Sequence, residues 1–287
     1  MQAKSNGKAA QAGLEAAPQN SLIGEKLKMK VSHFASAAAI ALLGASFAAP
    51  AANAVASNAA DAIPSNIAAA VASANRPTKD TDRDAARKPA EVLAFAGVAN
   101  GEQVLELIPG GGYFTRLLSG SVGPSGHVTE AVPLIGGADM SKASNGVAAD
   151  PHFGNVSEIP MSAESLAKAP GQFDLVWTSQ NYHDLHLTQL KLDVVGLDKL
   201  IYASLKPGGE FFIEDHAAKP GTGISTTDAL HRIDEDFLKQ EVESVGFKLV
   251  GESDVLRNPA DDHSLNVFKP EIRGHTDQFL LVFKKPK

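Results

Sequence analysis

The stretch Val104-Leu-Glu-Leu-Ile-Pro-Gly-Gly-Gly-Tyr-Phe-Thr-Arg-Leu-Leu118 decides the fold of this chain. It begins as a short apolar strand with an acid, Glu106, near its end, passes through a glycine-rich turn, and opens at once into a helix. Glycine lets the backbone approach a ligand closely, and a helix N-terminus offers N–H groups without partners inside the helix. Such a turn at the carboxyl edge of an open sheet is typical of a site for a nucleotide-type ligand.

The spacing of this turn excludes two common phosphate sites. The G-x-G-x-x-G pattern that holds a pyrophosphate is absent, and no Gly-Lys-Ser/Thr follows, which excludes a P-loop. The acid at the end of the strand indicates instead a ligand that carries a positive group.

Strand and helix patterns alternate on both sides of this stretch. Apolar residues recur at spacings of three and four over residues 187–201, and Gly120 is expected to stop the helix that follows the glycine-rich turn. The predicted helices cover residues 89–95, 113–119, 187–201 and 235–245, and the predicted strands cover 103–107, 127–131, 155–159, 173–178, 210–214, 247–251 and 278–284. Alternating strands and helices predict an α/β fold: a single doubly wound, mostly parallel seven-stranded sheet with helices on both faces, over residues 76–287.

Composition excludes several classes of protein. The 287 residues include 26 Lys and Arg against 33 Asp and Glu, a net charge of −7, and 44% are hydrophobic. This balance excludes wholesale disorder and a multi-span membrane protein, and it argues against a nucleic-acid binder with a general basic surface. The chain has no cysteine, which excludes disulfides, thiolate zinc sites and a cysteine nucleophile. The expected partner is a small-molecule substrate, and the oligomeric state is left open.

The N-terminal region differs in kind from the rest. Three lysines between positions 26 and 30 precede an apolar run over residues 35–47, and small residues follow up to Ala52-Asn53-Ala54. This pattern predicts a leader and secretory signal peptide over residues 1–54, with an alanine-rich tail or amphipathic helix as the alternative. Residues 55–75 are expected to be a linker or an N-terminal helix. The protein is therefore expected to be exported, to the periplasm, or to be cytoplasmic if no signal peptide is present.

The glycine-rich segment resembles motif I of the class I S-adenosylmethionine-dependent methyltransferases, which has an acid followed by spaced glycines. Glu106 takes the acid position, Gly110 and Gly112 take two glycine positions with Gly111 between them, and Ile108 replaces the first glycine. The resemblance implies S-adenosyl-L-methionine as the cofactor. A Cβ branch at Gly112 is expected to occupy space that the ligand needs.

Further landmarks extend this resemblance. Phe173-Asp-Leu-Val-Trp-Thr-Ser matches the strand 4 motif of these enzymes, and Leu205-Lys-Pro-Gly-Gly-Glu-Phe-Phe-Ile matches the turn into strand 5. The segments from Arg87 to Phe95, Asn181-Tyr-His-Asp, and from Arg257 to His263 look like those of a family of exported predicted methyltransferases. The resemblance covers residues 76–287.

The sequence departs from the methyltransferase pattern at two positions, which contact the ribose and the adenine of the cofactor. The acid that bonds the ribose is replaced by Val132, and Glu130, two residues earlier on the same strand face, is the candidate substitute. The adenine-contacting acid is replaced by Ser162, followed by Ala163. Export also conflicts with a cofactor made in the cytosol. The alternative is therefore an exported ligand-binding protein on a degenerate methyltransferase scaffold without catalysis.

The candidate catalytic residues follow strands 4 and 5 of the predicted sheet. His183, Asp184 and His216, with Asp215 beside the last, fall at the carboxyl edge, where a histidine with a carboxylate partner can take a proton from the methyl acceptor. The same groups also suit a divalent metal, and no metal ligand is assigned. The structural alternative is that His183 and Asp184 brace the next helix and that His186 is simply exposed.

The polar segment 254–276 is expected to be a loop that folds over the substrate. Arg257 and Arg273 are its candidate anion contacts, with solvated surface charge as the alternative. Trp177, inside a strand motif, is expected in the core.

Overall fold

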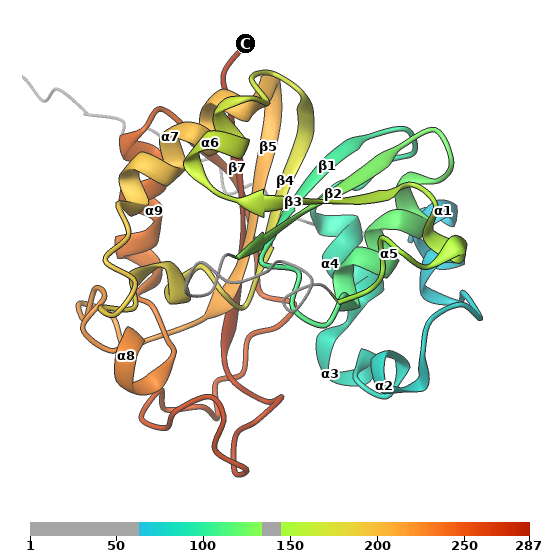
Figure 1. Ribbon diagram of the computed structural model, residues 1–287. Coiled ribbons are helices and arrows are strands. Elements are labelled where there is room, and N and C mark those ends of the chain that lie inside the picture. The colour runs from blue at the N-terminus through green and yellow to red at the C-terminus, as the bar shows by residue number, and fades with distance from the viewer. Residues whose placement is uncertain (1–62, 134–144) are drawn as a thin grey trace, which may run out of the picture. The chain divides into compact units, whose positions relative to one another are not determined.

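A seven-stranded sheet organises the part of the chain that the computed structural model describes, residues 63–133 and 145–287 (Figure 1). The strand order is β3-β2-β1-β4-β5-β7-β6, and β7 alone runs antiparallel to its two neighbours. The strands are β1 (Gln103–Leu107), β2 (His127–Pro133), β3 (Val156–Met161), β4 (Phe173–Ser179), β5 (Leu205–His216), β6 (Lys248–Ser253) and β7 (Gln278–Lys284). The predicted α/β class with a mostly parallel sheet is confirmed.

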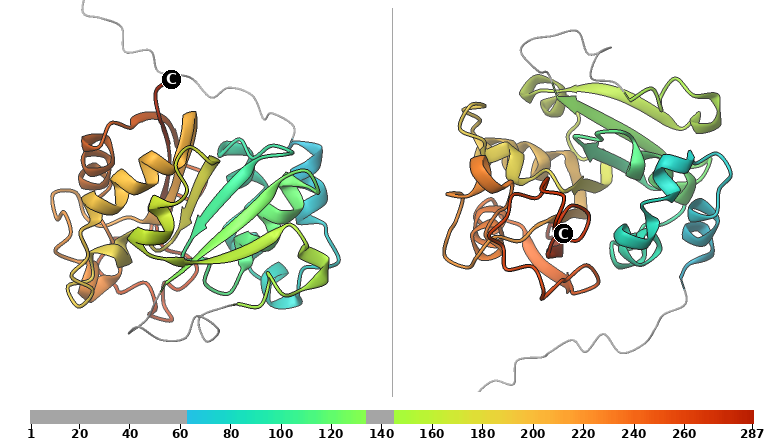
Figure 2. Two further views of the ribbon diagram at one scale, coloured as in Figure 1. Left: turned by 45° about the horizontal axis from the view of Figure 1, so that its top comes forward. Right: turned by 90° about the horizontal axis from the view of Figure 1, so that it is seen from below.

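Helices cover both faces of this sheet (Figures 1 and 2). The helices are α1 (Ser65–Val71), α2 (Thr78–Thr81), α3 (Asp84–Arg87), α4 (Pro89–Phe95), α5 (Tyr113–Val122), α6 (Ala163–Ala167), α7 (Val194–Ser204), α8 (Thr227–Leu230) and α9 (Glu235–Ser244), with 3-10 helices η3 (Pro151–Phe153) and η4 (His183–His186). One face carries α1, α4 and α5, and the other carries α6, α7 and α9. Among the residues described, no helix is long and apolar enough to cross a membrane.

Two hydrophobic cores lie on the two faces of the sheet. Successive strand residues point to opposite faces, so Val104 packs in the core with α4 and α5, whereas Leu105 packs in the core with α7 and α9. Trp177 is fully buried in the first core and stacks on Phe212, with ring centroids 4.0 Å apart. Burial on both faces is what makes the strand sequences continuously apolar.

The helix after the glycine-rich turn continues through Gly120, where the sequence indicated a stop. α5 runs to Val122, and Gly123 follows it with a φ of 66°. At Gly120 a Cβ would come 2.9 Å from the Cβ of Ala70 on α1, so this glycine permits close packing of two helices. Gly120 therefore has a packing role. The helix α1, which lies within the 55–75 region, packs against α5 at this point.

The amphipathic helix starts later than its apolar pattern indicated. α7 begins at Val194, where the Asp193 carboxylate caps it by accepting from the Gly196 N–H at 2.9 Å. Leu190, which fitted the helical spacing, is 52% exposed in the preceding loop. A capping residue thus determined the start of this helix more strongly than the apolar spacing.

The predicted leader, residues 1–54, and residues 134–144 lie outside the described residues. The carboxyl ends of β1, β4 and β5 meet at one edge of the sheet, and the candidate site residues follow these three strands.

Candidate active site at the carboxyl edge of the sheet

The glycine-rich turn after β1 is built on left-handed backbone. Ile108 has a φ of 51°, Gly110 a φ of 56° and Gly112 a φ of 76°. A branched residue with positive φ is strained, and Ile108 stands where the related motif has a glycine. The side-chain amide of Asn181, after β4, donates to the Ile108 carbonyl at 2.9 Å and holds the strained residue in place.

The turn is open on one side and filled on the other. A Cβ added at Gly110 or Gly111 would meet nothing within 4 Å. At Gly112 it would come 2.6 Å from Cγ2 of Val147, so the space there is taken by protein atoms rather than left for a ligand. The Arg116 guanidinium closes the same side, because it donates to the Gly112 carbonyl at 2.7 Å. A ligand at this turn would therefore lie against Gly110 and Gly111.

Glu106, the acid of the motif, is buried at the end of β1. Glu106 is only 3% exposed, and its Oε2 has no hydrogen-bond partner among the residues described. Burial raises the pKa of Glu106 to about 8, and the nearby carboxylate of Glu130 adds to the rise. A buried carboxylate with an unused oxygen is suited to a cationic partner, which would favour its charged form.

Glu130, expected to replace the missing ribose acid, is bonded inside the protein. Its Oε1 accepts from the Thr115 hydroxyl at 2.8 Å and from the Asn145 amide at 2.6 Å. The residue is fully buried, and burial raises its pKa. Val132, at the position of the ribose acid itself, is 1% exposed. Oε2 of Glu130, however, is buried without a hydrogen-bond partner among the described residues, so one carboxyl oxygen stays unused beside the ribose position.

Ser162 and Ala163 lie where β3 passes into α6. The Ser162 hydroxyl caps this short helix by accepting from the Ser165 N–H at 3.1 Å. Both residues line a largely apolar cavity of about 420 Å³, together with Leu197 and Leu200 of α7. An adenine-sized apolar ring suits such a lining, although the cap leaves the Ser162 hydroxyl partly engaged.

His183 is tied to the end of β5. Its backbone N–H donates to Oδ2 of Asp215 at 2.7 Å, and its Nδ1 lies 2.7 Å from Oδ1 of the same carboxylate. Burial lowers the pKa of His183, but Asp215 and Asp184 outweigh burial and raise the pKa to about 10. In this arrangement His183 is protonated at neutral pH, so it is not ready to accept a proton.

His216 has the opposite electrostatic setting. Its Nδ1 lies 2.7 Å from the Thr276 hydroxyl, and burial lowers its pKa to about 3 in spite of Asp215. His216 is therefore neutral at physiological pH. The two candidate catalytic histidines therefore differ in charge: His183 is charged and His216 is neutral, and their ring centroids lie 5.8 Å apart.

His186, expected to be exposed, has a side chain that is only 6% exposed. Its Nε2 lies 2.9 Å from the Glu241 carboxylate of α9, which also accepts from the Tyr182 hydroxyl at 2.9 Å. It braces η4 against α9.

A cleft lies beside His216. Two adjoining cavities of about 610 and 550 Å³ share lining residues from the α2–α3 segment and from the 254–276 segment. The larger one is lined by His216 and Gln180, and also by three arginines: Arg83, Arg87 and Arg273. The segment expected to cover the substrate does line this cleft. Arg257 lines the smaller cavity, and its guanidinium pairs with Glu235 of α9.

Arg87 lines the larger cavity of the cleft, and motif reasoning did not single it out. Its Nη2 donates to the Ser179 hydroxyl at 2.9 Å and lies 3.8 Å from Oε1 of Glu214. Its guanidinium lies 4.4 Å from the ring centroid of Tyr113. It therefore links the start of α5 to the ends of β4 and β5. In the sequence, the only indication was its position at the start of the segment from Arg87 to Phe95, which resembles that of the exported methyltransferase family.

The fold resembles those of known methyltransferases. A SAM-dependent methyltransferase from Aquifex aeolicus superposes with a TM-score of 0.50 at 17% identity, over 73% of this chain and 98% of that one. A protein assigned as a sarcosine dimethylglycine methyltransferase from Galdieria sulphuraria gives a TM-score of 0.52 at 17% identity, over 72% and 88%. The cyclase SpnF gives 0.51 at 17% identity, over 70% and 82%.

Sequence comparison adds no family. No protein-family model matches the chain, and no curated protein sequence matches it. The structural neighbours therefore establish a methyltransferase-like α/β fold, and the presence of a cyclase among them shows that this fold also carries other chemistry.

Proposed function

We propose that this protein is an S-adenosylmethionine-dependent methyltransferase that acts on a small molecule. The observation that carries the proposal is Glu106, a buried carboxylate with an unpartnered Oε2 next to an open glycine turn. Two of the fold neighbours, the Aquifex and Galdieria proteins, support it by their assignments. The cofactor would supply an electrophilic methyl group on a positively charged sulfur.

The residues fit the amino-acid end of this cofactor best. Glu106 is suited to the ammonium group, and Gly110 and Gly111 leave room for the chain beside it. The N-terminus of α5 favours a carboxylate through its unpaired N–H groups and its dipole. The fit at the ribose end is weaker, since Val132 replaces the usual acid and only Oε2 of Glu130 is left without a partner in the described residues.

The substrate would occupy the cleft beside His216. The arginines on its wall favour a small anionic or polar molecule, because Arg83 has no ion-pair partner in the described ranges and lines the cavity. His216 is the first candidate for proton acceptor because it lines the cavity and has an unprotonated imidazole, although its low pKa makes it a weak base. His183 with Asp184 is the competing acceptor unit expected from sequence.

Export of the protein is part of the proposal. It is supported by the lysines at 26–30, the apolar run 35–47 and the small residues at 52–54. An exported methyltransferase needs cofactor in its compartment. If none is present there, the same pocket serves another cationic small molecule.

The test is calorimetry of the full chain with S-adenosylhomocysteine and S-adenosylmethionine, followed by a turnover assay. We expect binding by the parent and at least tenfold weaker binding by Glu106→Gln, because a charged partner is lost. The matched control is Glu164→Gln, which removes an exposed carboxylate on α6 and leaves binding unchanged. Absence of binding to either ligand overturns the proposal. Binding without formation of S-adenosylhomocysteine identifies a binding protein instead.

A further inference from the structure

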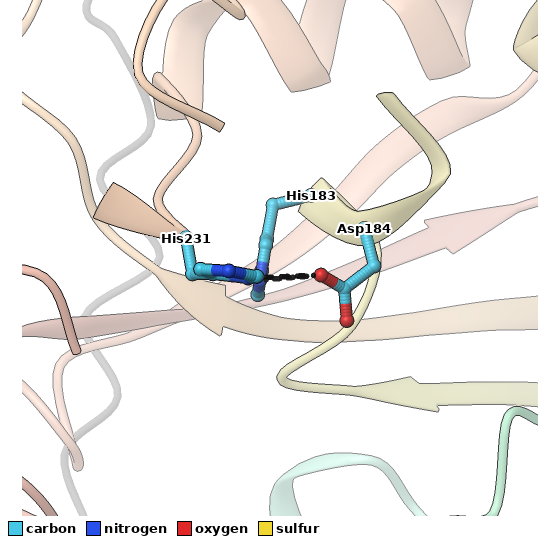
Figure 3. A group of neighbouring side chains, drawn as sticks. All are labelled: His183, Asp184 and His231. Atoms are coloured by element: carbon cyan, nitrogen blue, oxygen red, sulfur yellow. Dashed lines mark hydrogen bonds and ion pairs between the residues drawn. The ribbon is translucent and has the colours of Figure 1, made fainter. Parts of the chain in front are cut away.

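Three potential metal ligands converge beyond the ends of β4 and β5, at a place that the proposed cofactor site does not use. They are His183 and Asp184 on η4 and His231, which directly follows α8 (Figure 3). One ligand atom of each lies within 4.8 Å of the other two. The spacing of 47 residues between Asp184 and His231 gave no motif, so only the tertiary structure brings the set together.

His183 presents Nε2 to the centre of this group, and a metal ion bound there would displace the proton that the imidazolium carries on this nitrogen. The residue is 2% exposed, and its Nδ1 is engaged by the buried Asp215 at 2.7 Å. Its Nε2 makes no hydrogen bond in the described structure, although it lies 3.2 Å from Oδ1 of Asp184. A carboxylate behind a histidine is the usual second partner of a metal-bound imidazole, because it fixes the proton on the far nitrogen.

The distances suit a metal ion with little rearrangement. Oδ1 of Asp184 lies 3.2 Å from Nε2 of His183 and 3.1 Å from Nδ1 of His231. Zinc ligands at about 2.0–2.1 Å in a tetrahedron are about 3.3 Å apart. The side chains of Asp184 and His231 are 34% and 24% exposed, so a further coordination position faces outward.

The third ligand is fixed by its surroundings. His231 has a φ of 53°, a left-handed conformation that is strained for most residues, and its backbone N–H donates to the Thr227 carbonyl at 3.0 Å. Its ring packs edge-on against Phe268, with centroids 4.9 Å apart. The next residue, Arg232, is fully buried and paired with Asp261 at 2.8 Å. These contacts orient the imidazole before any ion is bound.

We propose that His183, Asp184 and His231 bind one divalent transition-metal ion of the zinc class. Two imidazoles and one carboxylate suit Zn²⁺, Co²⁺ or Fe²⁺, whereas Mg²⁺ prefers an all-oxygen set. The ion would lie beside the substrate cleft, because Phe268 and His216, the ring neighbours of two ligands, line its wall. Its outward position would take an oxygen or nitrogen atom of a small molecule.

The test uses Co²⁺ as a spectroscopic probe on the full chain after treatment with a chelator. We expect one Co²⁺ per chain with visible absorption bands of a nitrogen- and oxygen-bound ion, displaced by Zn²⁺ and not by equimolar Mg²⁺. His231→Asn should weaken binding at least tenfold while keeping the fold, because asparagine tolerates left-handed backbone. The matched control is His152→Asn, at an exposed histidine that also pairs with an aspartate, Asp150.

Each contrary result overturns the proposal. These are the absence of Co²⁺ binding, an unchanged affinity in His231→Asn, an equal loss in His152→Asn, or displacement by Mg²⁺. In that case the three side chains form an ion-pair cluster around a protonated His183. Since the readout is metal binding, its failure leaves the methyltransferase proposal standing, and failure of cofactor binding leaves the metal proposal standing.

Discussion

Glu106 and Glu130 lie opposite one another on the neighbouring parallel strands β1 and β2, and both carboxyl groups are buried. Two acids in this position repel each other when both are charged, so burial and proximity together hold the pKa of Glu106 at about 8. Thr115 and Asn145 bond Oε1 of Glu130, and in the described residues Oε2 of Glu130 and Oε2 of Glu106 both lack a hydrogen-bond partner. The pair therefore leaves two buried carboxyl oxygens that a positively charged or hydrogen-bond-donating ligand group would stabilise.

This pair predicts that the free energy of unfolding depends on pH. The folded-state pKa of Glu106 is raised from 4.5 to about 8, so its protonated form contributes stability below pH 4.5 that is lost as the pH rises through 8. Glu106→Gln should remove that pH dependence and raise the free energy of unfolding at pH 9, by on the order of a few kcal/mol. Denaturant unfolding at about pH 5 and pH 9 measures both effects. Equal stability of variant and parent at both pH values would contradict the buried-acid interpretation.

The glycine turn predicts different results at adjacent positions. Gly111→Val should leave the fold intact, since an added Cβ meets nothing within 4 Å, and should weaken S-adenosylhomocysteine binding at least tenfold. Gly112→Ala should instead destabilise the fold by about 1–3 kcal/mol, because its φ is 76° and its Cβ would meet Val147. Thermal unfolding and calorimetry separate the two effects. Parent-like binding by Gly111→Val would place the cofactor elsewhere.

The two histidines predict distinct pH–rate profiles. If His216 is the proton acceptor, His216→Ala should lower turnover about a hundred- to ten-thousand-fold, and the parent's rate at saturating cofactor should be flat between about pH 6 and pH 9. The flat profile follows because the pKa of His216 is held at about 3. If His183 is the acceptor, the rate should rise with pH towards about 10, the pKa of that group. Steady-state rates across this range decide between them.

The close packing at Gly120 predicts a stability effect far from the site. Gly120→Val should destabilise the protein by about 1–3 kcal/mol, because a side chain there meets Ala70 of α1. Ala70→Gly in the same chain should recover much of that loss by making room, and chemical denaturation of the single and double variants tests this. No rescue in the double variant would show that α1 does not rest on this contact.

The leader predicts a shortened mature protein. Intact-mass analysis of protein from its native host should find an N-terminus near Val55, after Ala52-Asn53-Ala54. A full-length species in the cytoplasm would contradict export. The result does not bear on cofactor binding, which is measured on the purified chain.

The sequence by itself determined the sheet and its edge. The period of two along β1 places Val104 and Leu105 in opposite cores, and the acid and glycines that follow belong to one continuous segment. Local patterns of this kind can be seen in sequence because the interacting residues are only a few positions apart. The same reasoning located β4 and β5 and therefore placed His183 and His216 at the carboxyl edge.

Only the tertiary structure decided which side chains meet. Asp215, 32 residues from His183, holds that imidazole and changes its charge, and His231 reaches Asp184 from 47 residues away. Gly120 lies inside a helix because Ala70 of another helix packs against it. Long-range contacts of this kind arise when strands and helices pack across the sheet, and no periodicity in the chain encodes which two residues will touch. Charge state follows from burial and neighbours, so the roles of the two histidines were fixed by the fold rather than by their motif.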